Sequence, residues 1–389
     1  MSKIQASWLQ SPFIQEIAFI LGPADIRFVG GAVRDTLVGR DIKDIDAATR
    51  WRPGETMEKL QAAGIKVIPT GLDHGTVTAV RGAEVIEITT LRHDVETDGR
   101  RAVVAFTDDW LADAKRRDFT MNAIYMAVDG TLYDPFGGEA DVRAGHVKFI
   151  GEASERIRED ALRILRFFRF HAHYGSGLLD EAGLQAAKAN VNMLERLSVE
   201  RIRDELCKLL AAPNPLQCLD AMQQADIWSH TPVVDVDLNG LKRVMAAEKT
   251  LGMGADILMR LVGLVGNRAG SVGRLLKMSN RDMQTLKDFS AGFHDAVPKD
   301  AQSMRVYLYR KGRDAGQGVV MAHPEACGHE LADMVANWPI PELPVRGRDL
   351  IARGMEPGPD ISKALKQLEE AWVASDFKLT KEDLLRLQR

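Results

Sequence analysis

Two aspartates separated by one residue are the first feature of this sequence that predicts chemistry. Asp44 and Asp46 lie in residues 43–49 (KDIDAAT), where the alternation of polar and apolar residues predicts a β-strand. Positions i and i+2 of a strand point to the same face, so the two carboxylates would lie side by side. Adjacent carboxylates repel each other and are costly to bury unless a cation compensates them. Because hard divalent cations prefer oxygen ligands, the pair predicts a Mg²⁺ site.

A glycine pair precedes these aspartates. Gly30 and Gly31, followed by Arg34 and Asp35, form the segment GGAVRD, where backbone N–H groups can approach a polyphosphate closely. Glu87, in the alternating segment VIEITTLR, is a candidate third carboxylate, although a solvated strand position explains it about equally well. In an attack on an α-phosphate, one metal activates the attacking 3′-hydroxyl and another holds the leaving pyrophosphate. The combination therefore predicts metal-assisted phosphoryl or nucleotidyl transfer.

A second dense polar cluster follows at residues 116–122 (RRDFTMN). Two adjacent arginines, Arg116 and Arg117, can clamp phosphates with their forked donors. Asp118 and Asn122 are expected one helical turn apart, where both can face a ribose hydroxyl. The alternative is an exposed, charged start of a helix.

The third cluster is EDALR, which is expected on one helix that begins near residue 154 and ends at Gly175. Asp160 and Arg163 are then i,i+3 neighbours, and Glu159 and Arg163 are i,i+4 neighbours. A surface ion pair explains this spacing, and so does a carboxylate–guanidinium edge that hydrogen-bonds the Watson–Crick face of a nucleotide. Arg166 lies on the same stripe as Arg163, and we count it among the nucleotide-binding candidates.

Bulk properties place these clusters in an ordinary globular protein. The chain has 389 residues, 45% hydrophobic and 27% charged residues, and a net charge of −4. Three scattered cysteines show no metal-ligand spacing, which is typical of free thiols in a reducing cytosol. The sequence shows no signal-peptide pattern and no apolar run of the ~18–20 residues that a membrane span requires. We therefore expect a cytoplasmic protein.

Strand and helix patterns alternate around the first two clusters, and helix patterns dominate from the third cluster onward. We therefore expect an α+β N-terminal part, made of a small mixed sheet with helices, followed by an all-α remainder. The first domain is expected to end near residue 150, and the chain after it is expected to be helical. Residues 94–101 (DVETDGRR) are polar, contain a glycine and lack an apolar period, so we expect a mobile loop there.

With these clusters in place, the sequence resembles the tRNA nucleotidyltransferase/poly(A) polymerase family, in its branch of class II CCA-adding enzymes. The resemblance covers residues 28–210 and rests on eight motifs in the family's order: FVGGAVRD, KDID, GLDHGTVTAV, VIEITTLR, RRDFTMNAI, DPFGG, EDALRILRFFRF and SVERIRDEL. It implies a catalytic nucleotidyltransferase head at residues 1–150, a helical neck with the base-recognition helix at 151–215, and a helical body and tail at 216–389. These helical domains would hold the acceptor and TΨC arms of tRNA. Residues 94–101 lie where the family keeps a flexible loop for the switch from CTP to ATP, but they lack its usual aromatic residue.

The resemblance also implies roles for the site residues. Asp44 and Asp46 would be the catalytic carboxylates that bind Mg²⁺, and Asp160 and Arg163 would form the base-reading edge. The remaining nucleotide-binding residues that it implies are Gly30, Gly31, Arg34 and Asp35 for the triphosphate, Arg117, Asp118 and Asn122 for ribose and phosphate, and Glu159 beside the base-reading pair.

The sequence thus predicts an enzyme that adds C, C and A to the 3′ end of tRNA from CTP and ATP, without a template, by two-metal transfer with release of pyrophosphate. A poly(A) polymerase and a CC-adding enzyme of the same family are the alternatives within this class. A catalytically silent tRNA-binding protein is the alternative from another class.

Overall fold

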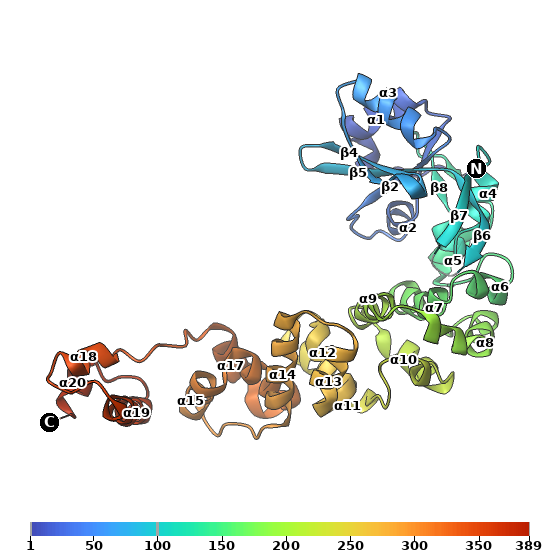
Figure 1. Cartoon of the computed structure of the whole chain (residues 1–389). Coiled ribbons are helices and arrows are strands. Elements are labelled where there is room, and N and C mark those ends of the chain that lie inside the picture. Colours follow the sequence, from blue (N-terminus) through green and yellow to red (C-terminus); the bar gives the residue numbers. More distant parts are fainter. Residues whose placement is uncertain (1, 99–100, 389) are drawn as a thin grey trace. The chain divides into compact units, whose positions relative to one another are not determined.

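The computed structural model of the protein describes residues 2–98 and 101–388. The chain divides into two compact units, Met1–Val234 and Asp235–Arg389. The first contains a β-sheet and several helices, and the second is helical (Figure 1). The predicted α+β part followed by an all-α part is therefore confirmed. The division into head, neck and body at residues 150 and 215 stays a prediction.

A seven-stranded mixed sheet forms the centre of the N-terminal part of the first unit. Its strand order is β3-β4-β5-β2-β1-β8-β9, in which β2 and β5 are parallel and all other neighbours are antiparallel. The strands are β1 (Ile26–Val29), β2 (Ile45–Thr49), β3 (Lys66–Gly71), β4 (Thr76–Arg81), β5 (Glu84–Thr90), β8 (Tyr125–Met126) and β9 (Leu132–Tyr133).

The two faces of this sheet differ because successive side chains of a strand alternate. The helices α1 (Pro12–Leu21) and α3 (Pro53–Ala62) lie on one face, and α2 (Gly31–Leu37) lies on the other (Figure 1). Ala47 pairs in register with Ile88, and both are buried. The next register pair back along the strands is Asp46 with Glu87, on the opposite face. The register therefore brings two carboxylate residues to neighbouring positions on one face.

Two expectations for the strands need correction. The strand β2 begins at Ile45, so Asp44 precedes the strand instead of lying within it. Residues 94–98 and 101, expected in a mobile loop, belong to the antiparallel pair β6 (Arg92–Asp98) and β7 (Arg101–Phe106), so that expectation is wrong for them. Gly99 and Arg100, the rest of the expected loop, lie outside the described residues. The segment DVETD of β6 is mostly polar and has no apolar alternation, so its sequence did not indicate a strand. Most of the apolar residues of this strand pair are in β7, RAVVAF.

Helices form the rest of the first unit. They are α4 (Trp110–Lys115), α5 (Gly138–Ala144), α6 (Ala153–Glu159), α7 (Leu162–Tyr174), α8 (Glu181–Ala189), α9 (Val199–Leu210) and α10 (Pro215–Gln224). Short 3₁₀ helices are Ser7–Gln10, Leu72–His74, Thr120–Asn122, Val191–Arg196 and Trp228–His230. The helix α7 packs against both α9 and α10. The single helix expected from residue 154 to Gly175 is wrong, because α6 ends at Glu159 and α7 starts at Leu162.

The hydrophobic cores of the second unit include two separate clusters. One contains Met304, Leu308 and Val319, and the other contains Leu368 and Trp372. The helices of this unit are α11 (Leu238–Leu251), α12 (Ile257–Val265), α13 (Ala269–Leu275), α14 (Asn280–His294), α15 (Ala301–Lys311), α16 (Arg313–Ala322), α17 (Pro324–Asn337), α18 (Gly347–Ile351), α19 (Pro359–Ala374) and α20 (Lys381–Arg386), with one 3₁₀ turn at Gly266–Arg268.

Candidate active site

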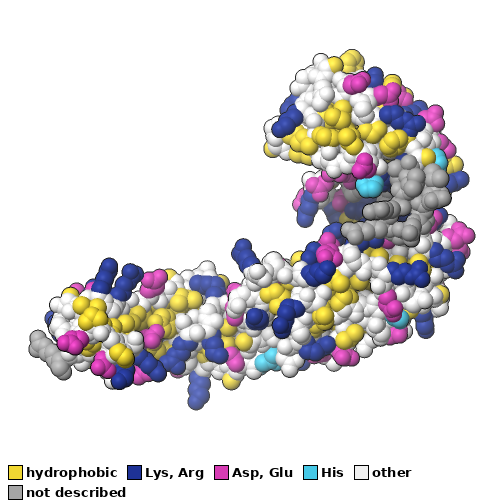
Figure 2. Space-filling view, in the orientation of Figure 1, with side chains coloured by type: hydrophobic (Ala, Val, Ile, Leu, Met, Phe, Trp, Pro, Cys, Tyr) yellow, Lys and Arg dark blue, Asp and Glu magenta, His cyan; other side chains and the backbone are white. Residues whose placement is uncertain are grey.

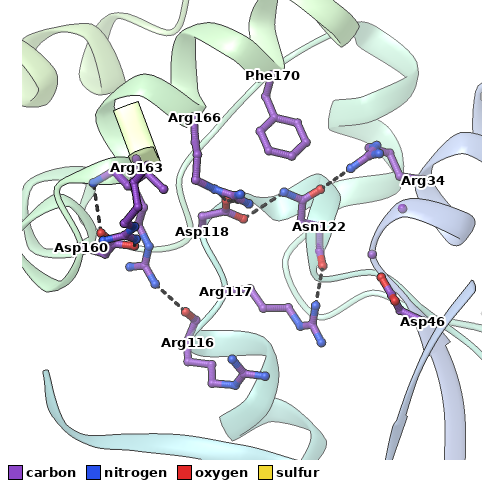
Figure 3. A pocket seen from close by; sticks show the side chains of 14 residues that line it. Arg34, Asp46, Arg116, Arg117, Asp118, Asn122, Asp160, Arg163, Arg166 and Phe170 are labelled. Atoms are coloured by element: carbon purple, nitrogen blue, oxygen red, sulfur yellow. Dashed lines mark hydrogen bonds and ion pairs between the residues drawn. The ribbon is translucent and has the colours of Figure 1, made fainter. Parts of the chain in front are cut away.

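A polar cavity of about 420 Å³ in the first unit collects most of the predicted site residues (Figure 3). Its lining comes from α2 and the turn before it, from β2, from residues 116–122, from the break between α6 and α7, and from the helices α7 and α9. The lining residues are Gly30, Gly31, Arg34, Asp46, Arg116, Arg117, Asp118, Asn122, Asp160, Leu162, Arg163, Arg166, Phe170 and Arg201. Six arginines and three aspartates give the cavity an excess of positive charge, which suits a polyanionic ligand.

The glycine turn between β1 and α2 lies directly beside Asp46. Gly30 has a φ of 76°, a conformation that side-chain-bearing residues rarely adopt. A Cβ atom built on Gly30 would lie 3.8 Å from Oδ2 of Asp46. The turn therefore leaves an open backbone surface next to the carboxylate, as a phosphate chain bound to a metal would require.

Asp46 lies in a negative environment. Partial burial, followed by the nearby carboxylates of Glu87 and Asp44, raises the pKa of Asp46, and Arg117 partly opposes this. A cation placed between these carboxylates would relieve their repulsion. Within residues 2–98 and 101–388, no cluster of three or more His, Cys, Asp or Glu side chains is arranged to hold a metal. The donors nevertheless fit Mg²⁺, which is usually held by one or two carboxylates together with substrate phosphates.

A continuous chain of hydrogen bonds crosses the cavity from α2 to α7. Nη1 of Arg34 donates to Oδ1 of Asn122 at 2.8 Å, and Nδ2 of Asn122 donates to Oδ1 of Asp118 at 2.9 Å. Nε of Arg166 then donates to Oδ2 of Asp118 at 2.7 Å (Figure 3). Burial opposes ionisation of Asp118, but Arg166 and Asn122 outweigh it and lower the pKa of this carboxyl. Asp118 is thus an ionised acceptor held at a fixed place in the wall.

Asp118 and Asn122 were expected one turn apart on a helix. This expectation is wrong, because α4 ends at Lys115. Phe119 is fully buried and packs against Phe149 and Phe170, with ring centroids 4.8 and 5.2 Å away. Its backbone is extended and forms a β-bridge with Phe149, so residues 118–119 do not continue the helix α4. A 3₁₀ turn at Thr120–Asn122 then brings Asn122 back to Asp118. The two side chains meet through a turn stabilised by aromatic packing.

Arg116 and Arg117 share one buried carboxylate, that of Asp113. Oδ1 of Asp113 accepts from Nε of Arg116 at 2.8 Å, and Oδ2 accepts from Nη2 of Arg117 at 3.2 Å. The hydroxyl of Tyr125 donates to the same Oδ2 at 2.6 Å. Burial opposes the charge of Asp113, but Arg117 and Arg116 overcome it and lower its pKa to about 2. Asp113 thus fixes both arginines from behind the cavity.

The break between α6 and α7 brings Asp160 into the cavity. Asp160 has an extended backbone conformation, with φ −150° and ψ 107°, and its Oδ1 accepts from the N–H of Leu162 at 3.1 Å. Its Oδ2 accepts from Nη2 of Arg201 in α9 at 2.7 Å. The partner of Asp160 therefore comes from a different helix, 41 residues further along the chain.

Arg163 is held by other groups. Its Nη1 donates to Oε2 of Glu159 at 2.5 Å, and its Nη2 donates to the carbonyl of Arg116 at 2.9 Å (Figure 3). Glu159 also pairs with Arg156 and lines a second cavity of about 560 Å³ next to the first. The i,i+4 pair of Glu159 and Arg163 is thus present, and it places the Arg163 guanidinium in the same cavity as Asp160.

The structure brings ten of the fourteen predicted site residues into the lining of one cavity. Asp35, Asp44, Glu87 and Glu159 lie outside this lining, and each neighbours a residue that belongs to it. Sequence reasoning assigned no role to Arg201, Phe170 or Asp113. The motif SVERIRDEL contains Arg201 and was the one available signal for it.

Comparison with known proteins gives the family. The sequence matches the poly(A) polymerase head domain over residues 26–148, and a probable RNA- and SrmB-binding site of polymerase A over residues 177–238. It is 34% identical to CCA tRNA nucleotidyltransferase 1, mitochondrial, of Danio rerio, over 93% of this chain and 86% of the relative. The human protein of that name is also 34% identical, over 98% of this chain and 92% of the relative. The chain belongs to the CCA tRNA nucleotidyltransferase family.

The structural comparison agrees with this family. The crystal structure of the Bacillus stearothermophilus CCA-adding enzyme in complex with CTP matches with a TM-score of 0.77 and 29% identity, over 98% of each chain. The resemblance predicted from the motifs is thus confirmed, and the chain is a nucleotidyltransferase. Membership of a nucleotidyltransferase family implies dependence on a divalent metal ion. Among the described residues, no helix is both long enough and apolar enough to cross a bilayer.

Proposed function

We propose that this protein adds C, C and A to the 3′ end of tRNA, using CTP and ATP and no nucleic-acid template. The observation that carries the proposal is the single cavity that joins three kinds of group. Asp46 can face the reacting phosphate, Asp118 and its arginines can face ribose and phosphates, and Asp160 with Arg163 can face the base. A simpler phosphotransferase has no need of a base-reading edge in the same wall.

Phosphoryl chemistry belongs to the Asp46 end of the cavity. Asp44 and Asp46 would hold Mg²⁺, and Mg²⁺ bound there supplies charge neutralisation and Lewis-acid activation. The open turn at Gly30 leaves space for the triphosphate beside Asp46. Arg116 and Arg117 are held in place by Asp113 and offer positive charge to the phosphates without having to reorganise. Release of pyrophosphate follows from attack of the tRNA 3′-hydroxyl on the α-phosphate.

Base selection belongs to Asp160 and Arg163. Cytosine and adenine each present an amino donor beside a ring-nitrogen acceptor, whereas uracil and guanine present a carbonyl acceptor beside an N–H donor. A carboxylate accepts and a guanidinium donates, so the pair complements cytosine and adenine and opposes uracil and guanine. Asp160 is fixed by Arg201, and Arg163 is fixed by Glu159. We propose that this rigid pair replaces a template.

Transfer RNA is the proposed acceptor, and the helical part after residue 150 is its proposed binding surface for the acceptor and TΨC arms. A Thermotoga maritima CCA-adding enzyme complexed with tRNA shares this fold, with a TM-score of 0.69 and 20% identity. On the face shown in Figure 2, lysine and arginine side chains of the second unit are interspersed with acidic ones. Scattered cations of this kind suit phosphate contacts spread along a duplex arm.

Two finer assignments complete the proposal. We propose Mg²⁺ as the metal because the donors at Asp44 and Asp46 are carboxylates. We also propose a cytoplasmic location, since the scattered thiols fit a reducing compartment. Both of the relatives compared above are named mitochondrial. Fractionation of source cells with an antibody against this chain separates the two compartments.

The proposed activity is tested by incubating the pure protein with Mg²⁺, a tRNA that lacks CCA, and labelled CTP followed by ATP. We expect two additions with CTP alone and one further addition with ATP. A long adenylate tail would identify a poly(A) polymerase, and two additions without a third would identify a CC-adding enzyme. No extension and no pyrophosphate release would identify a catalytically silent tRNA-binding protein.

A further inference from the structure

The last residue of α7, Tyr174, joins this helix to α2 through Arg34, which lines the cavity. Its hydroxyl accepts from Nη2 of Arg34 at 2.7 Å and donates to Oδ1 of Asp35 at 2.8 Å. Arg34 also donates to Asp35 through Nε at 3.1 Å. Burial raises the pKa of Tyr174, so its hydroxyl stays protonated at neutral pH and can donate to Asp35. One phenol group therefore bridges the arginine and the aspartate of the GGAVRD segment.

The ring of Tyr174 adds a second kind of contact. The guanidinium carbon of Arg34 lies 4.2 Å from the ring centroid, and that of Arg40 lies 4.4 Å from it. Arg40 also donates to the backbone carbonyl of His173 at 2.5 Å. Cation–π contacts of this kind are strongest where the cation is shielded from water, and the side chain of Arg34 is only 10% exposed. Ring and hydroxyl together restrain the guanidinium of Arg34, which binds Tyr174 through Nη2 and Asn122 through Nη1.

Arg34 passes this restraint to the groups proposed to face the ribose. Its Nη1 holds Oδ1 of Asn122, which leaves the amide of Asn122 oriented to donate to Asp118. Asn122 and Asp118 are both buried, so neither can easily adopt another hydrogen-bonded arrangement. A change at Tyr174 would therefore alter the direction of the Asp118 carboxylate, although Tyr174 itself is absent from the cavity lining.

We propose that Tyr174 is a positioning residue that orients Arg34, and through it Asn122 and Asp118, for recognition of the ribose 2′-hydroxyl. This inference rests on the proposed function, because it assumes that Asp118 faces the sugar of a bound nucleotide. The distinguishing feature is the path from phenol to guanidinium to amide to carboxylate, in which each link is a hydrogen bond of 2.7–2.9 Å.

The test uses Tyr174→Phe, which removes the hydroxyl and keeps the ring over Arg34. Equilibrium binding of CTP and of 2′-deoxy-CTP to the full-length protein is measured by titration calorimetry with Mg²⁺. If Asp118 no longer accepts from the ribose 2′-hydroxyl in this variant, one hydrogen bond to a charged group is lost, and CTP should bind about tenfold more weakly. We expect a smaller loss for 2′-deoxy-CTP, which lacks the hydroxyl, so that the preference for CTP falls several-fold.

Tyr309→Phe is the matched control. The hydroxyl of Tyr309 donates to Oε1 of Glu369 at 2.6 Å in the second unit, so this variant also loses one phenol–carboxylate hydrogen bond. It should keep the wild-type ratio of CTP to 2′-deoxy-CTP affinity. If Tyr174→Phe does not fold, Asp35→Asn is the second variant, because it weakens the hydrogen bond that Asp35 accepts from the Tyr174 hydroxyl. It should also lower the ratio of CTP to 2′-deoxy-CTP affinity.

An unchanged ratio in the folded variant would overturn the positioning role, and so would equal weakening of both nucleotides, which would mean a purely structural role. A wild-type protein that binds both nucleotides equally would also overturn it. The proposed function is decided separately, by extension of tRNA by the wild-type protein. Extension by the wild type together with an unchanged ratio in Tyr174→Phe refutes the role of Tyr174 alone.

Discussion

Replacement of Asp113 by asparagine should destabilise the first unit strongly, although Asp113 touches no part of the cavity lumen. Asp113 is 1% exposed and is the shared partner of Arg116 and Arg117, whose side chains are 17% and 19% exposed. Asparagine keeps the shape but loses the charge, and its amide nitrogen would face donors. The substitution leaves two mostly buried guanidinium groups without the carboxylate that they share.

The size of the effect follows from this burial. Removing one partner of a buried ion pair costs about 3–5 kcal/mol, because the remaining charge stays desolvated. A unit of this size shifts its midpoint by about 2–4 °C for each kcal/mol, so we expect Asp113→Asn to lower the Tm of the first unit by about 6–20 °C. Because the pKa of Asp113 is lowered to about 2, its contribution is complete above pH ~4 and is lost as the pH falls toward 2.

Thermal unfolding followed by circular dichroism at pH 7 and at pH 3 measures both effects. Asp129→Asn is the control, since Asp129 also has a pKa of about 2, lowered by the backbone and side chain of Thr131 and by Lys3. Its side chain is 55% exposed, so solvent screening should keep its cost well under about 1 kcal/mol. A Tm change for Asp113→Asn no larger than that of Asp129→Asn would show that the buried charge of Asp113 does not stabilise the first unit.

Three further predictions concern the cavity. Asp46→Ala and Asp44→Ala should each abolish incorporation of both CTP and ATP while circular dichroism stays unchanged; full activity with Mg²⁺ would contradict the metal assignment. Asp160→Ala and Arg163→Ala should damage the choice among CTP, ATP and UTP more than tRNA affinity; unchanged discrimination would count against the base edge. Burial and neighbouring carboxylates raise the pKa of Asp46, so a proton competes with Mg²⁺ for this carboxylate. Mg²⁺ affinity, measured by calorimetric titration, should therefore increase as the pH rises through that pKa. Weaker Mg²⁺ binding at the higher pH would argue against this competition.

Local patterns made much of the head predictable. The alternation in KDIDAAT predicted a strand, and the structure forms β2 over its last five residues. The turn at Gly30 and Gly31 was predicted from glycine alone, and the positive φ of Gly30 explains why glycine is needed there. The polar-apolar alternation and the glycine pair are local patterns, so they can be interpreted without knowledge of tertiary contacts.

The parts that were not predictable depend on residues far apart in the sequence. The helix break at Asp160 is stabilised by Arg201, 41 residues later, and EDALR alone satisfies every local rule for an unbroken helix. The RRDF segment leaves its helix because Phe119 enters an aromatic core with Phe149 and Phe170. Tertiary packing overrode helical periodicity in both places, and both changes bring polar side chains into the cavity.

The cavity itself is expected to select C, C and then A, and the composition of the added 3′ end measures this selection. The wild-type protein is incubated with a tRNA lacking CCA, Mg²⁺ and all four nucleoside triphosphates at equal concentration, and the product is analysed by mass spectrometry. We predict a single product extended by C, C and A, with no uridylate or guanylate. Incorporation of the four nucleotides without preference, or an unextended tRNA, would contradict selection by the cavity.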